Sequence, residues 1–166
     1  MTMKKLLLLL LIILPLTLHS QINITPYVSS GYINHLGRDG VSTELGVDAE
    51  FFKRADLSID YRFAKATRDV GNDVTFSGIS STISFILINR NNNRFMIGTG
   101  LTHGSYKRYT DYLGFEKEYQ DSWWDPVKLR YDYTLLNKIR VGAIISLTGE
   151  DGDSSTYFGV LLGYKF

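Results

Sequence analysis

The chain has 166 residues, no cysteine, and 18 basic residues against 17 acidic ones. This near-balance of charge excludes the electrostatic attraction on which nucleic-acid binding depends. The lack of cysteine excludes a disulfide framework and lipid attachment to an N-terminal cysteine. No Gly-rich phosphate-binding motif is present, so no cofactor is predicted.

Residues 1–20, "MTMKKLLLLLLIILPLTLHS", predict a signal peptide that is cleaved after Ser20. Lys4 and Lys5 precede an apolar run over residues 6–14, which is too short for a transmembrane helix. Residues 21–166 are then one exported domain of 146 residues with 16 basic and 17 acidic side chains, a formal charge of −1.

From Gln21 onward the dominant hydrophobic period is two, which predicts an all-β domain. Residues 41–51 show it well, with Val41 and Leu45 on one face and Glu44 and Asp48 on the other. Eight strands are predicted, approximately over residues 22–36, 41–52, 57–67, 74–88, 95–107, 122–135, 139–148 and 156–166.

The connections alternate between short turns, such as "KRAD", "NRNNN" and "NK", and longer or more charged stretches, such as "RDVGND" and "GEDGDSS". With antiparallel neighbours, one end of the molecule then carries the short turns and the other the larger loops. This pattern predicts an eight-stranded antiparallel up-and-down transmembrane β-barrel. A soluble lipocalin-like ligand-binding barrel, with its apolar face inward, is the alternative.

The position of aromatic and charged residues favours an apolar face turned to lipid. Aromatic side chains of that face lie near strand ends, where two interfacial girdles are expected: Phe51, Phe95 and Phe166 at one end, and Tyr32, Phe76, Trp123 and Phe158 at the other. The polar face holds five acids and five bases that can pair in a closed interior: Glu44, Asp48, Glu50, Asp60, Arg62, Lys128, Arg130, Asp132, Arg140 and Lys165.

The chain ends on Phe166, with Tyr164 and Leu162 at alternate positions before it. This ending resembles the sorting signal of bacterial outer-membrane barrels, and the eight-strand pattern over residues 21–166 resembles the small OmpA-domain/OmpX-like family. The resemblance implies a Gram-negative outer-membrane location and contact with outer-membrane lipid and lipopolysaccharide. It also implies recognition by the barrel insertion machinery, a monomer, and both chain ends at the periplasmic end.

Side chains just fill the interior of an eight-stranded barrel, so a wide pore is not expected. Tyr27, Tyr157 and Trp124 are predicted to fill the interior further, and a narrow water path stays open as an alternative. The expected role is structural, or a surface interaction through the outer loops.

The largest connection, residues 105–124, alternates aromatic and charged side chains. It is predicted either to continue the fifth and sixth strands as a protruding hairpin or to be a solvated loop. Tyr109, Tyr112, Phe115 and Tyr119 are the candidate contacts for a surface protein or glycan ligand.

His103 and Ser105, with Glu116 downstream, raise a catalytic alternative, because a histidine that deprotonates a serine is the basis of acyl transfer. The pair resembles the His-x-Ser of the outer-membrane lipid A deacylase family. Tyr106 stands where that family has Asn, and the pair lies on the fifth strand rather than nearer the C-terminus. We therefore predict that the protein is not an enzyme.

Metal binding has weak support in the sequence. Glu150, Asp151 and Asp153 offer oxygen ligands but lack the spacing of a calcium loop. His35 and His103 have opposite strand parity, which argues against a shared metal. No metal site is predicted.

Overall fold

The computed structural model describes residues 22–35, 37–51, 54–67, 73–110, 115–150 and 153–166. The predicted signal peptide, residues 1–20, lies outside them. Within the described ranges there is no helix long and apolar enough to cross a membrane. The strands are β1 (Asn23–His35), β2 (Arg38–Phe51), β3 (Ala55–Thr67), β4 (Asp73–Arg90), β5 (Asn93–Thr110), β6 (Phe115–Leu135), β7 (Ile139–Glu150) and β8 (Asp153–Tyr164).

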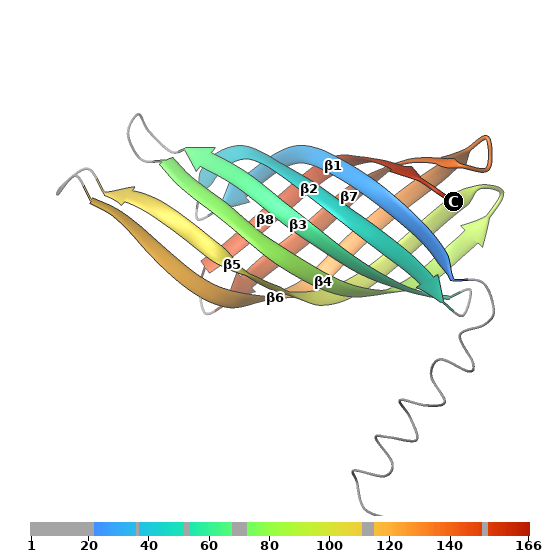
Figure 1. Ribbon diagram of the computed structural model, residues 1–166, viewed down its shortest axis with the longest axis horizontal. Coiled ribbons are helices and arrows are strands. Elements are labelled where there is room, and N and C mark those ends of the chain that lie inside the picture. The colour runs from blue at the N-terminus through green and yellow to red at the C-terminus, as the bar shows by residue number, and fades with distance from the viewer. Residues whose placement is uncertain (1–21, 36, 52–53, 68–72, 111–114, 151–152) are drawn as a thin grey trace, which may run out of the picture.

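The eight strands form one closed barrel in which every strand is antiparallel to its neighbours. β1 pairs with β8 from Tyr27 opposite Gly163 to His35 opposite Ser155, and this pairing leaves no free sheet edge. The chain's last residues lie at the same end of the barrel as the start of β1 (Figure 1). The predicted fold class is confirmed.

Tight turns join strands at the end that also holds the C-terminus. Asn91 and Asn92 join β4 to β5 with φ of 51° and 66°, and Leu136 and Asn137 after β6 have φ of 50° and 60°. Two successive positive φ values match the twist of paired strands, and Asn tolerates this conformation better than most residues. These are the turns predicted from "NRNNN" and "NK".

At the opposite end the strands run further than predicted into stretches expected as loops, and β5 and β6 follow the hairpin alternative. β5 and β6 remain paired until Thr110 faces Phe115, and β7 and β8 until Glu150 faces Asp153. Continued pairing satisfies backbone hydrogen bonds that a loop would leave to water. The hairpins β3–β4 and β5–β6 extend beyond the other two, so this end of the barrel is oblique (Figure 1).

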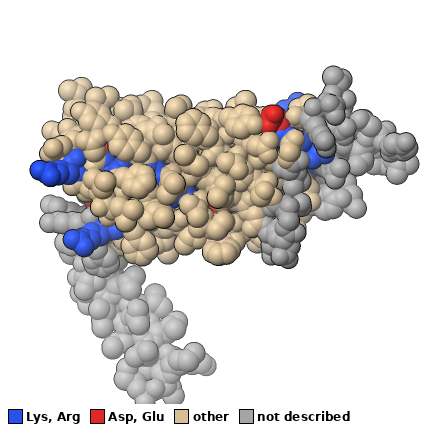
Figure 2. Space-filling model, turned by 180° about the vertical axis from the view of Figure 1, so that it is seen from behind, with Lys and Arg blue, Asp and Glu red and all other residues tan. Residues whose placement is uncertain are grey.

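The two faces of the sheet have opposite polarity. Leu45 and Val160 face outward with 59% and 66% of their surface exposed, whereas Glu44, between Thr43 and Leu45 in the chain, is fully buried. Figure 2 shows the result on one side of the molecule: Lys, Arg, Asp and Glu lie mainly near the two ends. The apolar face is therefore outside and the charged face inside, the reverse of a soluble ligand-carrying barrel.

Candidate functional site

Aromatic side chains flank the outward apolar band at both ends. Tyr32 and Phe158 are exposed near the end with the long hairpins, and Phe166 is exposed at the other end, where Phe51 and Phe95 are half-buried. Such girdles lie at the two water interfaces of a membrane barrel. Leu162, Tyr164 and Phe166 all face outward, and the rings of Tyr164 and Phe166 meet edge-on at 5.3 Å.

Two of the predicted girdle residues, Phe76 and Trp123, are inside the barrel instead, and Trp124 is outside. The rings of Phe76 and Trp123 pack against each other at 5.2 Å. Trp124 is 57% exposed, and its indole N–H donates to Thr99 Oγ1 at 2.9 Å on the outer surface. These three predictions were wrong.

A β-bulge explains the inversion in β6. Gly98 pairs with Lys128, but two residues later Gly100 pairs with Asp125, so β6 contains one extra residue. An extra residue reverses which face each following side chain occupies. Pro126 marks the place, because proline within a strand is found at bulges and edges.

The centre of the barrel holds Glu44 between two cations. Arg62 Nε donates to Glu44 Oε1 at 2.8 Å, Arg62 Nη2 lies 2.6 Å from the same oxygen, and Lys128 Nζ lies 3.9 Å from Oε2. Lys128 also donates to Asp60 at 3.1 Å, and so does the Tyr27 hydroxyl. All five side chains are at most 5% exposed.

A second cluster lies around Asp48. Arg130 Nη1 donates a hydrogen bond to Asp48 Oδ1 at 2.9 Å, and Arg130 Nη2 lies 2.7 Å from Asp48 Oδ2. Arg130 Nε also donates to Asp132 at 2.8 Å. Arg140 Nη1 lies 3.6 Å from Asp48 and 4.0 Å from Asp132. One charge-assisted hydrogen bond and one close ion pair therefore hold Arg130 against Asp48.

The remaining predicted interior charges, Glu50 and Lys165, lie toward the end with the tight turns. Glu50 is 3.6 Å from Arg94 Nη1 and 3.7 Å from Arg140 Nη2. The Lys165 side chain is half-buried just after the end of β8. Its backbone N–H donates to the carbonyl of Lys138 at 2.7 Å.

Four buried interior charges were missing from the prediction: Arg38, Asp56, Arg94 and Asp125. Arg38 lies in "GRDG", the short connection predicted after the first strand. Asp56 and Arg94 lie in or next to the predicted turns "KRAD" and "NRNNN", although they pair at 2.5 Å inside the barrel. Asp125 is absent from the predicted set because the bulge was not recognised; its carboxylate accepts a hydrogen bond from Thr102 Oγ1 at 2.6 Å. The first three of these charges could have been found by extending the predicted strands into "GRDG", "KRAD" and "NRNNN", where β2, β3 and β5 begin.

Aromatic rings fill space between the charges. Arg130 lies over the ring of Tyr27 at 4.8 Å, and Arg62 over Tyr157 at 5.6 Å. A Cβ at Gly46 would lie 2.6 Å from the Tyr27 ring, so this ring occupies the space a side chain would need. The interior is filled as expected for eight strands.

The candidate catalytic residues do not form a triad. His103 faces outward, and its Nδ1 lies 2.8 Å from the hydroxyl of Ser122 on β6, across from it. Ser105 is two residues away on the same outer face of β5 and makes no hydrogen bond to His103. The side chain of Glu116 lies outside the described residues. No described carboxylate is hydrogen-bonded to His103, so the carboxylate that orients the histidine of a catalytic triad has no counterpart among the described residues.

The candidate surface contacts belong to the long hairpin. Tyr109 lies at the end of β5, and Phe115 and Tyr119 in the first part of β6, so the backbone continues both strands as one of the two expected alternatives requires. Their side chains, and Tyr112 altogether, lie outside the described residues, as do Asp151 and the side chains of Glu150 and Asp153. Among the residues that are described, no three His, Asp or Glu side chains converge as metal ligands would.

No protein-family model matches the chain, and no curated protein matches it. Solved structures do. Neisserial surface protein A (NspA) superposes with a TM-score of 0.70 at 11% identity, covering 87% of this chain and 97% of that one. The chain has the fold of the small outer-membrane β-barrels.

Two further structures agree on this fold. Ail, the attachment invasion locus protein of Yersinia pestis, has a TM-score of 0.60 at 12% identity and covers 87% and 97% of the two chains. The N-terminal β-barrel domain of Pseudomonas aeruginosa OprF has a TM-score of 0.60 at 12% identity over 88% and 98%. Ail was also solved with the heparin analogue sucrose octasulfate. At these identities the similarity concerns the fold.

Proposed function

We propose that the protein is an integral outer-membrane β-barrel without a wide pore, exported by a signal peptide over residues 1–20 and inserted as residues 21–166. One observation carries the proposal: an exposed apolar surface surrounds a closed barrel in which most of the buried charges form ion pairs. In water this surface would be an aggregation hazard, whereas in lipid it is solvated. The chain ends then lie in the periplasm and the long hairpins outside the cell.

The role that we propose is structural or a surface interaction, with no catalysis. The β5–β6 hairpin supports an interaction, because it carries paired strands and alternating aromatic and charged residues past the rest of the barrel. Tyr109, Tyr112, Phe115 and Tyr119 are its proposed contacts with a surface protein or glycan. Outer-membrane lipid, lipopolysaccharide and the insertion machinery are its proposed envelope partners, and the protein acts as a monomer.

Gel migration tests the membrane assignment. A folded barrel extracted in detergent should migrate differently in SDS before and after boiling, and detergent should be required to keep it in solution. A chain lacking residues 1–20 that is folded and monomeric in water without detergent would refute the assignment.

Cell-surface display tests the interaction. Cells displaying the chain should bind a surface protein or glycan on an array, and binding should fall when residues 109–119 are replaced by a two-residue turn. Deletion of Glu150 and Asp153, which shortens the β7–β8 hairpin by one residue pair and keeps its two-residue connection, is the matched control. If both variants bind the ligand equally well, the proposal that the β5–β6 hairpin makes the contact is wrong.

A further inference from the structure

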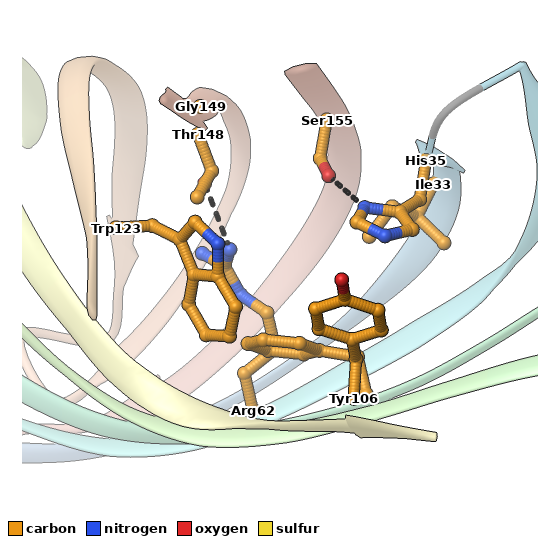
Figure 3. Close-up of a pocket in the computed structure, with 9 residues that line it drawn as sticks. Ile33, His35, Arg62, Tyr106, Trp123, Thr148, Gly149 and Ser155 are labelled. Carbon is orange, nitrogen blue, oxygen red and sulfur yellow. Dashed lines mark hydrogen bonds between the residues drawn. The ribbon is translucent and has the colours of Figure 1, made fainter. Parts of the chain in front are cut away.

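A pocket opens in the outer mouth of the barrel, above the central charges (Figure 3). It has a volume of about 470 Å³, counting the part that is open to solvent. All four hairpins contribute to it through Ile33, His35, Arg62, Phe76, Tyr106, Trp123, Thr148, Gly149 and Ser155. The cavity itself is about 30 Å³, room for one or two water molecules, so a larger ligand would lie in the part that is open to solvent.

One wall of this pocket is aromatic. Trp123 packs against Phe76 at 5.2 Å and against Tyr106 at 6.2 Å, and Tyr106 in turn meets the His35 ring edge-on at 6.2 Å. Trp123 is in this wall because of the bulge at Pro126, without which the indole would face lipid. Bulges are enriched beside functional sites, where they re-aim a side chain.

The other side of the pocket is polar. Arg62 lies under it and donates from Nη1 to the Thr148 hydroxyl at 3.2 Å, and the His35 ring is hydrogen-bonded to the Ser155 hydroxyl. Figure 3 shows both bonds, together with Trp123 and Tyr106 facing the same space. None of the nine lining residues is a carboxylate, and Glu44 pairs with Arg62 from below.

We propose that the open part of this pocket, in the mouth of the barrel, binds the terminal sugar of a glycan. An aromatic wall offers an apolar face to the C–H groups of a sugar ring, while the hydroxyls and the guanidinium on the opposite side offer fixed partners for ring hydroxyls. None of the described lining residues is acidic and Arg62 lies under the pocket, which disfavours a cationic ligand.

This inference rests on the proposed function, since only an outward-facing mouth meets a glycan. The two tryptophans of the chain allow the two claims to be tested separately. Trp124→Phe leaves Trp123 as the reporter of the pocket, and Trp123→Phe leaves Trp124 as the reporter of the outer surface. Both variants are reconstituted in vesicles, with heat-modifiable migration as proof of folding.

Fluorescence titration with galactose, N-acetylglucosamine and N-acetylneuraminic acid is the binding test. We expect at least one sugar to change Trp123 emission saturably in Trp124→Phe, with a Kd of the order of 1 mM, and to leave Trp124 emission unchanged in Trp123→Phe. In the Trp124→Phe background, Thr148→Val should weaken binding about three- to tenfold, as expected for one hydrogen bond. Thr99→Val, on the outer surface, should not.

Absence of a saturable Trp123 response to all three sugars in the folded protein would overturn the sugar site, and so would equal weakening by Thr148→Val and Thr99→Val. Brominated lipids provide the separate test of the membrane assignment: they should quench Trp124 and spare Trp123. Equal quenching of both would contradict the proposed function, whatever the sugars do.

The source of the sugar is decided by two further titrations. Core oligosaccharide released from lipopolysaccharide represents the cell's own envelope, and lactose and sialyllactose represent glycans that the cell meets. Tighter binding of an oligosaccharide than of its terminal monosaccharide identifies the source and supports the site. Failure of every oligosaccharide to compete with a bound monosaccharide would overturn the assignment to a glycan terminus.

Discussion

The two faces of each strand obey different rules. On β2, the side chains of Leu45 and Val47 face outward and are exposed. The side chains of Glu44 and Asp48 face inward, and each forms an ion pair with a residue on another strand. An outward side chain is therefore tolerated if its hydropathy suits its depth in the membrane. An inward one needs a particular partner, so errors inside are costlier than errors outside.

Removing Arg130 should have the largest effect on stability. Arg130→Met retains the aliphatic stem but strips Asp48 of its two-point contact and Asp132 of its 2.8 Å partner. Loss of one member of a buried pair costs about 3–5 kcal/mol, because the remaining charge is left buried. The free energy of unfolding in urea, measured in lipid vesicles, is the readout.

A double variant sharpens this prediction. Arg130→Met with Asp48→Leu removes both charges and leaves Asp132 with Arg140, 4.0 Å apart. It should recover a large part of the lost stability, because no isolated carboxylate remains at position 48. A single Arg130→Met variant as stable as the parent would contradict the view that the interior depends on specific pairs.

A charge on the outer surface should have the next largest effect. Leu45 is outward and lies opposite Tyr61 on β3, midway along both strands. Leu45→Arg should cost about 2–4 kcal/mol, the range for arginine near the bilayer midplane. Lys65→Arg, on an exposed cation nearer the outer rim, should change the free energy of unfolding by less than about 0.5 kcal/mol. Similar losses at the two positions would argue against a membrane depth profile.

The same contrast explains how far the sequence predicted the structure. The fold and the polarity of β2, β3 and β7 follow from strict alternation, since one buried face determines the register of a strand. Together with the aromatic side chains near strand ends and the balanced charges, this pattern placed Glu44, Asp60 and Arg140 inside. Their partners across the barrel could not be predicted, because alternation says which face a residue occupies but not what it meets there.

Prediction failed where alternation is interrupted. The bulge at Pro126 exchanged the places of Trp123 and Trp124, and Phe76 was misplaced because β4 carries serine and threonine on both faces, which hides the polarity. The outer mouth was therefore missed, since its aromatic wall consists of Phe76, Trp123 and Tyr106. A proline inside a predicted strand is a reason to assign the residues before it to both faces in turn. Doing so at Pro126 would have included Trp123 among the possible interior residues.

A substitution at Phe166 should impair insertion in cells more than it lowers the stability of the folded barrel. The Phe166 side chain is 81% exposed and contacts the Tyr164 ring. Phe166→Ser should change the unfolding free energy of the refolded protein by less than about 1 kcal/mol. It should nevertheless lower the amount of heat-modifiable barrel in cells several-fold, because the terminal aromatic is the proposed recognition signal. Val160→Ser, on the same outer face of β8, is the control. Normal assembly of Phe166→Ser in cells would contradict the proposal that Phe166 is the recognition signal.

His103 should have the smallest effect, because its outward position gives it one hydrogen-bonding partner and no carboxylate among the described residues. His103→Ala should leave the acyl-chain pattern of lipid A unchanged, as measured by mass spectrometry of cells with and without the protein. Ser122→Ala and Ser105→Ala make the test decisive, because the structure joins His103 to Ser122 while the sequence pattern pairs it with Ser105. Loss of a protein-dependent deacylated species in His103→Ala and in one serine variant would establish an enzyme. Which serine it is would show whether the cross-strand pair or the sequence pattern carries the activity.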